Sequence, residues 1–211
     1  MTTPTYLATK LTRLLAPIGC LIITAACANA PNMDEATLHA LAPLTPQIAQ
    51  VKPVEVTFAS YWLREQSRDH TKADIAALQQ RYSERLTAAL VEALSAQGWQ
   101  VSTTQTASST GKTTVRARVD NMRITAPDFD GALVDLYANN EHGAGDFAVI
   151  FEKNGEIKAQ FKDQRSVQAG AGGNQLTRTS RVINQQAFVR TFKRFIDDSF
   201  ELASQEATQN P

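Results

Sequence analysis

The two cysteines of this chain lie close together at its N-terminal end. Cys20 and Cys27 are followed by a body, residues 28–211, that contains none. Neither a disulfide nor a cysteine-ligated metal can therefore hold that body together. Its stability has to come from an apolar core, and the 43% hydrophobic and 20% charged residues are the composition of an ordinary globular domain. The 211 residues fit one domain or two small ones.

The N-terminus has the charge pattern of a secretory signal. Residues 1–13 carry Lys10 and Arg13 and no acid, and residues 14–26 are uncharged. The apolar run is too short to span a bilayer, which takes roughly 20 apolar residues. A basic start, a short apolar run and small residues before a cut are typical of an exported protein.

The end of that run, Thr24-Ala25-Ala26-Cys27, resembles the bacterial lipobox. The resemblance implies a lipoprotein signal peptide over 1–26, cleavage before Cys27, and palmitate-type lipidation of the Cys27 thiol and amine. Thr24 stands where the pattern more often has leucine. Ala28 follows the cysteine, and the absence of aspartate there implies sorting to the periplasmic face of the outer membrane in a Gram-negative host.

Two other readings of the N-terminus stay open. An ordinary signal peptide cut after Ala28 or Ala30 also fits a small-x-small site, and Pro31 disfavours the second cut. An uncleaved N-terminal helix is the third reading, and Pro17 argues against it.

The mature chain divides into a tether and one domain. Prolines and small residues over 27–52 indicate a flexible lipidated N-terminus. The domain is predicted over residues 53–205. Residues 206–211 are predicted to form a disordered tail. A strand is expected over 54–58, reaching 62 at its longest, followed by a charged connection. Apolar residues three to four apart predict a helix over 72–97, and Gly98 ends it. A short strand is expected over 99–101.

The second half reads as three strands and a helix. Alternation predicts a strand over 113–124, a mainly loop segment over 127–145, and an apolar strand over 147–151. Asn154-Gly155 predicts a two-residue hairpin turn into a strand over 157–162. A glycine-rich loop and a helix over 184–205 follow. This order predicts an α+β fold: a mostly antiparallel sheet of about five strands with two long helices packed on one face.

The sequence offers little catalytic chemistry. His39 and His70 have no second ligand at a zinc-like spacing. His142 lies in an acidic segment that could bind a divalent cation, although a solvated acidic loop is the favoured interpretation; its acids are Asp128, Asp130, Asp135, Glu141 and Asp146. The glycines of 170–173 lack the Lys-Ser/Thr of a phosphate loop, and no serine, including Ser60, Ser83 and Ser166, stands in a Gly-x-Ser-x-Gly setting. We expect no enzyme activity, cofactor or metal.

The charge balance does not favour a nucleic-acid partner. Basic and acidic residues number 21 each, and removal of 1–26 leaves 19 basic residues against 21 acidic ones. Nucleic-acid binders normally carry a basic excess. A C-terminal basic cluster could contact anionic headgroups beside the anchor, but a solvated helix face is the favoured interpretation; its members are Arg178, Arg181, Arg190, Lys193 and Arg194.

A broader resemblance covers residues 50–203. The helix segment 82–94, the Gly98-Trp99-Gln100-Val101 step and the alternating strand 115–119 resemble bacterial envelope lipoproteins that carry a domain of unknown function, the one catalogued as 3313. Such a resemblance implies an α+β lipoprotein and carries over no catalytic residue.

Three functions follow as hypotheses. The first is a non-enzymatic binding or accessory lipoprotein of the cell envelope, with an envelope protein as its partner. The second is a carrier of a lipid or small apolar ligand, in a cavity lined by Trp62, Trp99 and the C-terminal phenylalanines. The third, an enzyme, requires that Asp128, Asp130 and His142 converge.

Overall fold

The computed structural model describes residues 32–33, 47–103, 112–125, 127, 129, 141–168 and 181–209. Within these ranges the chain forms an α+β layer. Its strands are β1 (Asn32–Met33), β2 (Ile48–Val51), β3 (Glu55–Phe58), β4 (Gln100–Ser102), β5 (Thr113–Ile124), β6 (Glu141–Lys153) and β7 (Glu156–Gln168). Its helices are α2 (Ser60–Gln66), α3 (Lys72–Ala96) and α4 (Arg181–Gln209).

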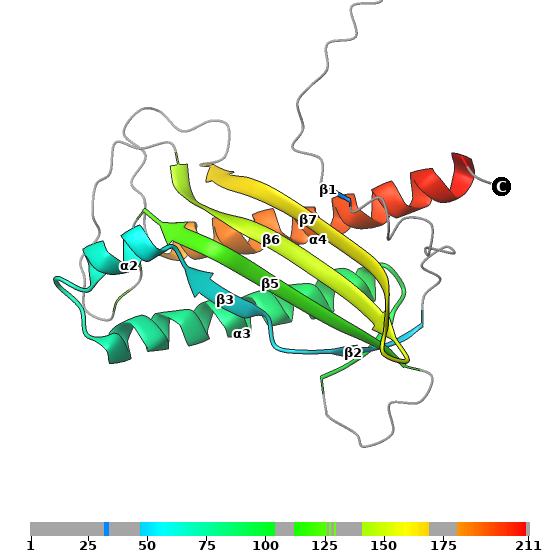
Figure 1. The fold of residues 1–211 in the computed structure, drawn as a ribbon, viewed down its shortest axis with the longest axis horizontal. Helices are drawn as coiled ribbons and strands as arrows, with labels where there is room; N and C mark the ends of the chain where they lie inside the picture. Colours follow the sequence, from blue (N-terminus) through cyan, green and yellow to red (C-terminus); the bar gives the residue numbers. More distant parts are fainter. Residues whose placement is uncertain are drawn as a thin grey trace, which may run out of the picture.

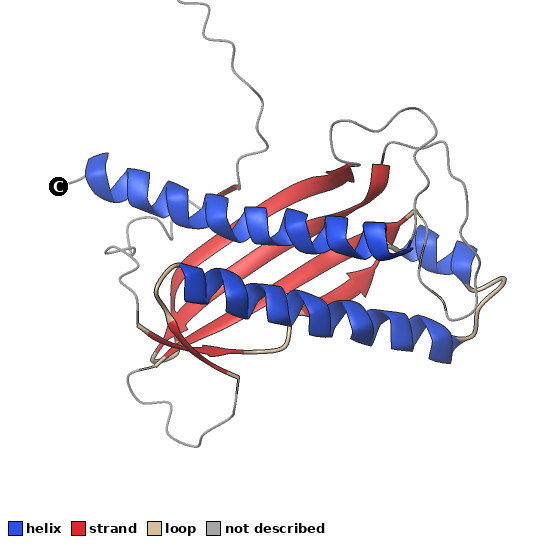
Figure 2. Ribbon diagram, turned by 180° about the vertical axis from the view of Figure 1, so that it is seen from behind, coloured by secondary structure: helices blue, strands red, loops and turns tan. Residues whose placement is uncertain are grey.

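All seven described strands belong to one sheet, in the order β1-β7-β6-β5-β2-β4, with β3 paired to β5 further along that strand. The long helices α3 and α4 lie side by side over one face, which Figure 2 presents to the reader. Figure 1 looks onto the opposite face. We call that opposite face of β5, β6 and β7 the open face.

The sheet is mixed, which corrects the expectation of a mostly antiparallel sheet of about five strands. The pairs β5–β6, β6–β7 and β1–β7 are antiparallel, whereas β2–β4, β2–β5 and β3–β5 are parallel. Parallel neighbours need a crossover, and α2 and α3 supply it between β3 and β4. Two strands, β1 and β2, lie in the stretch 27–52 that the proline-rich composition assigns to a flexible tether.

Regular structure that packs in the core precedes residue 53. Ala49 and Val51 of β2 are buried in the core, and the Lys52 amide donates to the Val115 carbonyl at 3.0 Å. At the other end, α4 runs to Gln209 and so enters the stretch predicted as a disordered tail. The prolines near β2 and the polar residues at the end of α4 gave no sequence signal for these elements. Packing in the core maintains β2, and continuation of the helix maintains the end of α4.

Helix α2 replaces the strand extension and charged connection predicted between 58 and 71. The chain leaves β3 at Ala59, and the Trp62 indole Nε1 donates to the Ile124 carbonyl at 2.9 Å. The Trp62 ring also lies 4.6 Å from the Phe58 ring. These contacts turn the chain over the end of β5, so the alternation that continues past Phe58 does not form strand.

The local signals of the sequence are confirmed elsewhere. Helix α3 (Lys72–Ala96) matches the helix predicted over 72–97 and begins with a capping box between Thr71 and Asp74 that was not predicted. Asn154 and Gly155 have φ values of 55° and 83°, the left-handed geometry of a type I′ turn. Strand β5 occupies the predicted bounds. Strand β6 begins six residues before the predicted apolar run of 147–151, which corrects the prediction of loop for residues 141–145, because these residues pair with β5 and β7.

Candidate functional site

The predicted lipidation site, Cys27, lies outside the described residues, as do the cut site, His39 and the glycine run of 170–173. Asp128, Asp130 and Asp135 of the acidic segment also lie outside them. Lipidation of Cys27 therefore stays a prediction.

His142 is a buried core residue at the start of β6. The residue is 1% exposed, its Nδ1 has no hydrogen-bond partner within the described structure, and Asn184 of α4 lies near enough to influence its pKa. Burial is the main cause that lowers its pKa below the ordinary 6.5, and the charge of Arg190 acts in the same direction, while Asn184 opposes them. A depressed pKa favours the neutral imidazole, which suits a structural role in the interior.

The structure does not bring His142 together with Asp146. The Asp146 carboxylate lies on the open face, where it accepts hydrogen bonds from Asn121 at 2.7 Å and Gln164 at 3.1 Å. Among the residues that the structure describes, no three His, Cys, Asp or Glu side chains gather to hold a metal ion.

A polar contact joins the two long helices near His142. The Arg85 guanidinium of α3 donates to the amide oxygen of Gln185, and the rings of Tyr82 and Phe188 meet edge-on with centroids 5.6 Å apart. Gln185 is 2% exposed whereas Arg85 is exposed, so this part-buried bond lies at the margin of the interface between the helices. The contact fixes the packing of α3 on α4.

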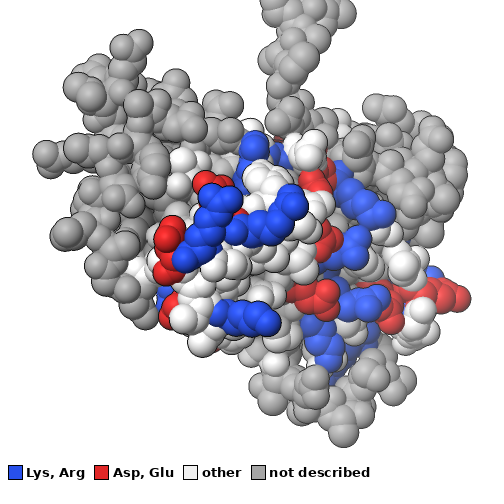
Figure 3. All heavy atoms as spheres, turned by 60° about the vertical axis from the view of Figure 1, so that its left-hand side comes forward, with Lys and Arg blue, Asp and Glu red and all other residues white. Residues whose placement is uncertain are grey.

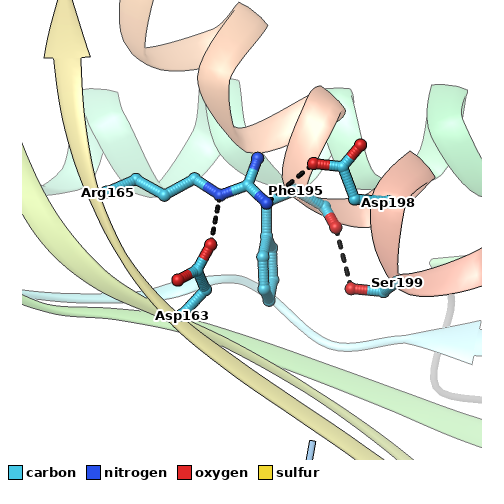
Figure 4. Close-up of polar contacts among 5 residues, drawn as sticks. All are labelled: Asp163, Arg165, Phe195, Asp198 and Ser199. Carbon is cyan, nitrogen blue, oxygen red and sulfur yellow. Dashed lines mark hydrogen bonds and ion pairs between the residues drawn. The ribbon is translucent and has the colours of Figure 1, made fainter. Parts of the chain in front are cut away.

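A buried ion-pair cluster on β7, formed by Asp163, Arg165 and Asp198, was not predicted from the sequence (Figure 4). The Arg165 guanidinium donates to Asp163 at 2.6 Å and to Asp198 of α4 at 2.7 Å, and its carbon Cζ lies 5.5 Å from the centre of the Phe195 ring. The side chains of Arg165 and Asp163 are 6% and 8% exposed, whereas Asp198 is 36% exposed. The sequence does contain a pattern that indicates this cluster. The alternation that places Ala159 and Phe161 inward continues to Asp163 and Arg165.

Burial raises the pKa of Asp163 above its ordinary 3.8, and the nearby Asp198 charge adds to this effect. The hydrogen bond and charge of Arg165 act in the opposite direction. Desolvation thus outweighs the ion pair, as is common for enclosed carboxylates. The cluster joins α4 to β7, which only the two-residue strand β1 separates from the edge of the sheet.

The open face carries charges of both signs. Arg116 pairs with Glu152 at 2.6 Å and Arg118 with Asp120 at 3.0 Å. A shallow hollow lies between β5, β6 and β7; it is lined by Arg118, Asp120, Asp146, Phe147, Ala148, Lys162, Asp163 and Gln164. The space-filling view in Figure 3 likewise shows Lys and Arg interspersed with Asp and Glu.

The aromatic residues singled out for a ligand cavity pack against each other. The ring centroid of Trp99 lies 5.8 Å from that of Phe151 and 6.3 Å from that of Phe200. The ring centroid of Phe147 lies 6.0 Å from that of Phe192 and 5.8 Å from that of Phe195. These rings fill the layer between the sheet and α4. The Trp99 Nε1 has no hydrogen-bond partner within the described structure.

The basic cluster of α4 is only partly solvated. Lys193 forms an ion pair with Glu92 of α3, whereas Arg190 and Arg194 are exposed. Arg178 and the side chain of Arg181 lie outside the described residues.

Comparisons with protein-family models, curated proteins and solved structures found no match to the chain. Within the described residues, no helix is both long and apolar enough to cross a membrane.

Proposed function

We propose that this chain is a bacterial lipoprotein, held by lipid on Cys27 at the periplasmic face of the outer membrane, with a non-enzymatic binding or accessory role in the cell envelope. The observation that carries the proposal is the position of Cys27 directly after the uncharged run 14–26, behind three small residues. Several acyl chains on one cysteine would anchor the domain stably, whereas one chain would not.

The partner we propose is another protein of the envelope, and the part of the open face formed by β5 and β6 is the surface we assign to it. The helices leave this face uncovered by any described element, and its charges of both signs suit complementary pairing with a protein.

The anchor is tested by feeding cells an alkyne analogue of palmitate and comparing the wild-type chain with Cys27→Ala. We expect label on the wild-type chain alone, in the outer-membrane fraction, and an N-terminal peptide that begins with modified Cys27. Cys20→Ala is the matched control and should keep the label, because Cys20 lies inside the proposed signal peptide. An unlabelled wild-type chain that begins at Asn29 or Pro31 would sink the proposal.

A further inference from the structure

The N-terminal strand β1 limits how far the domain can move from the proposed lipid. It pairs with β7, with Asn32 opposite Lys162 and Met33 opposite Phe161. From Cys27 to Asn32 there are five residue steps, which reach at most about 18 Å when fully extended. A tether free as far as Gln47 would instead reach about 70 Å.

We propose that the β7 edge of the sheet lies at the phospholipid surface, held there by the pairing of β1 with β7. This inference rests on the proposed lipidation of Cys27. The short connection keeps Lys162 close to the headgroups. The domain then keeps one orientation relative to the membrane, with the β7 edge nearest to it. A long tether would allow all orientations.

The opposite side of the domain is farther from the anchor. Four strand spacings separate β7 from β4, about 19 Å across the sheet. Helix α3 packs on β2, β3 and β4, at that far side. In Figure 1, β1 and β7 lie at one edge of the sheet and α3 lies beyond β3 at the other.

The exposed side chains of β7 suit a surface of phosphate groups. From 157 to 167 the side chains that reach solvent are neutral or basic: Ile157, Lys158, Gln160, Lys162, Gln164 and Ser166. Glu156, at the start of the strand, is exposed and pairs with Lys158, so Lys162 is the basic side chain that carries the argument. The one acid in this stretch, Asp163, is turned inward to Arg165 (Figure 4). A lysine held near an anionic bilayer is attracted to it, so Lys162 favours this edge over one that exposes unpaired carboxylates.

The experiment uses the chain from Cys27 onward, with a synthetic diacyl lipid coupled to its single thiol and vesicles of phosphatidylethanolamine and phosphatidylglycerol. A fluorophore is attached through an azide-bearing amino acid in place of Lys162, or in place of Gln80 on the exposed face of α3. Quenching by a headgroup-linked quencher reports proximity to the membrane. Chemical coupling makes the readout independent of lipidation in cells, so this inference and the proposed anchor fail separately.

Two matched insertions discriminate a docked β1 from a free tether. A flexible Gly-Ser spacer, with a mean reach of about 25 Å at about 20 residues, is placed either between Ala28 and Asn29 or between His39 and Ala40. We expect strong quenching at position 162 and weak quenching at position 80 in the parent chain. The upstream spacer should abolish that difference and the downstream spacer should preserve it. Equal quenching at the two positions, or equal effects of the two spacers, would overturn the inference.

Discussion

At the scale of the residue, Arg165 brings a positive charge into the interior, and its two carboxylate partners make that burial tolerable. Its guanidinium contacts Asp163, Asp198 and the face of Phe195. Removing one partner of a buried pair leaves an uncompensated charge, which is far more destabilising than replacing both partners with apolar side chains.

We therefore predict that Arg165→Met lowers the free energy of unfolding at pH 7 by about 3–5 kcal/mol, because Asp163 is left buried and unpaired. Loss of Arg165 removes the groups that oppose the upward shift of the Asp163 pKa. The native state then binds a proton more readily than the unfolded state. Its stability is retained below the unfolded pKa of 3.8 and lost as the pH rises through the raised pKa.

Urea unfolding at pH 7 and at about pH 4 measures both effects. The destabilisation should shrink at the lower pH, because the raised pKa of Asp163 leaves a larger share of its carboxyl groups protonated there. The control is the double variant Asp163→Leu/Arg165→Met, which should recover much of the lost stability. A deficit that is equal at both pH values would argue against an unpaired carboxylate as its cause.

At the scale of the element, α3 covers the backbone of residues 54–56, where β3 begins, with a polar stripe. The Thr87 hydroxyl accepts from the Val54 amide at 2.8 Å, the Ser83 hydroxyl donates to the Val54 carbonyl at 2.5 Å, and the Gln79 amide donates to the Val56 carbonyl. These three residues lie four apart and so share one face of the helix. The stripe satisfies a strand edge that would otherwise be open to another chain.

Thr87→Val should lower the free energy of unfolding by about 1–3 kcal/mol, because the Val54 amide loses its acceptor while the side chain keeps its shape. Chemical denaturation measures the change. Ser95→Ala is the matched control on the same helix. The exposed Ser95 hydroxyl only donates to the Val91 carbonyl, so its loss should change stability by less than about 0.5 kcal/mol. If both variants behave alike, the stripe does not contribute to the stability of the β3 edge.

The stripe was not predictable from the sequence. Helical periodicity assigns Ser83 to a groove or a solvent-facing position, and nothing in the pattern indicates that a strand edge lies there. The partner backbone is 29 residues away in the chain, and only the crossover from β3 to α3 brings it into reach.

At the scale of the whole molecule, the start of the domain is decided by packing across the sheet. Strand β2 lies between β4 and β5, and the side chain of Gln47 accepts hydrogen bonds from Thr113 and Lys153. We predict that a chain beginning at Gln47 unfolds cooperatively, whereas a chain beginning at Pro53 is less stable by about 2–4 kcal/mol.

The loss comes from the buried side chains of Ala49 and Val51 and from the unpaired edge of β5. Urea titrations of the two truncated chains, monitored by tryptophan fluorescence, measure the difference. Equal midpoints would show that the domain begins at residue 53, as the proline-rich composition predicts.

The sequence by itself determined the features that depend only on residues close together in the chain. The capping box at Thr71, the apolar spacing of α3 and the Asn154-Gly155 turn act within a few residues, so their positions follow from the sequence. The alternation over 113–124 likewise set the bounds of β5. The signal-like N-terminus is read from local pattern in the same way, and it stays a prediction.

Tertiary structure decided which strands pair and in which direction. Short strands such as β2 and β4 have no local signal for a parallel neighbour, because their partners lie 50 or more residues away and are chosen by burial of side chains from both strands. The inward charge of Arg165 follows the same rule. Alternation indicates that its side chain points into the core, but only the approach of α4 supplies Asp198 and Phe195 to receive it.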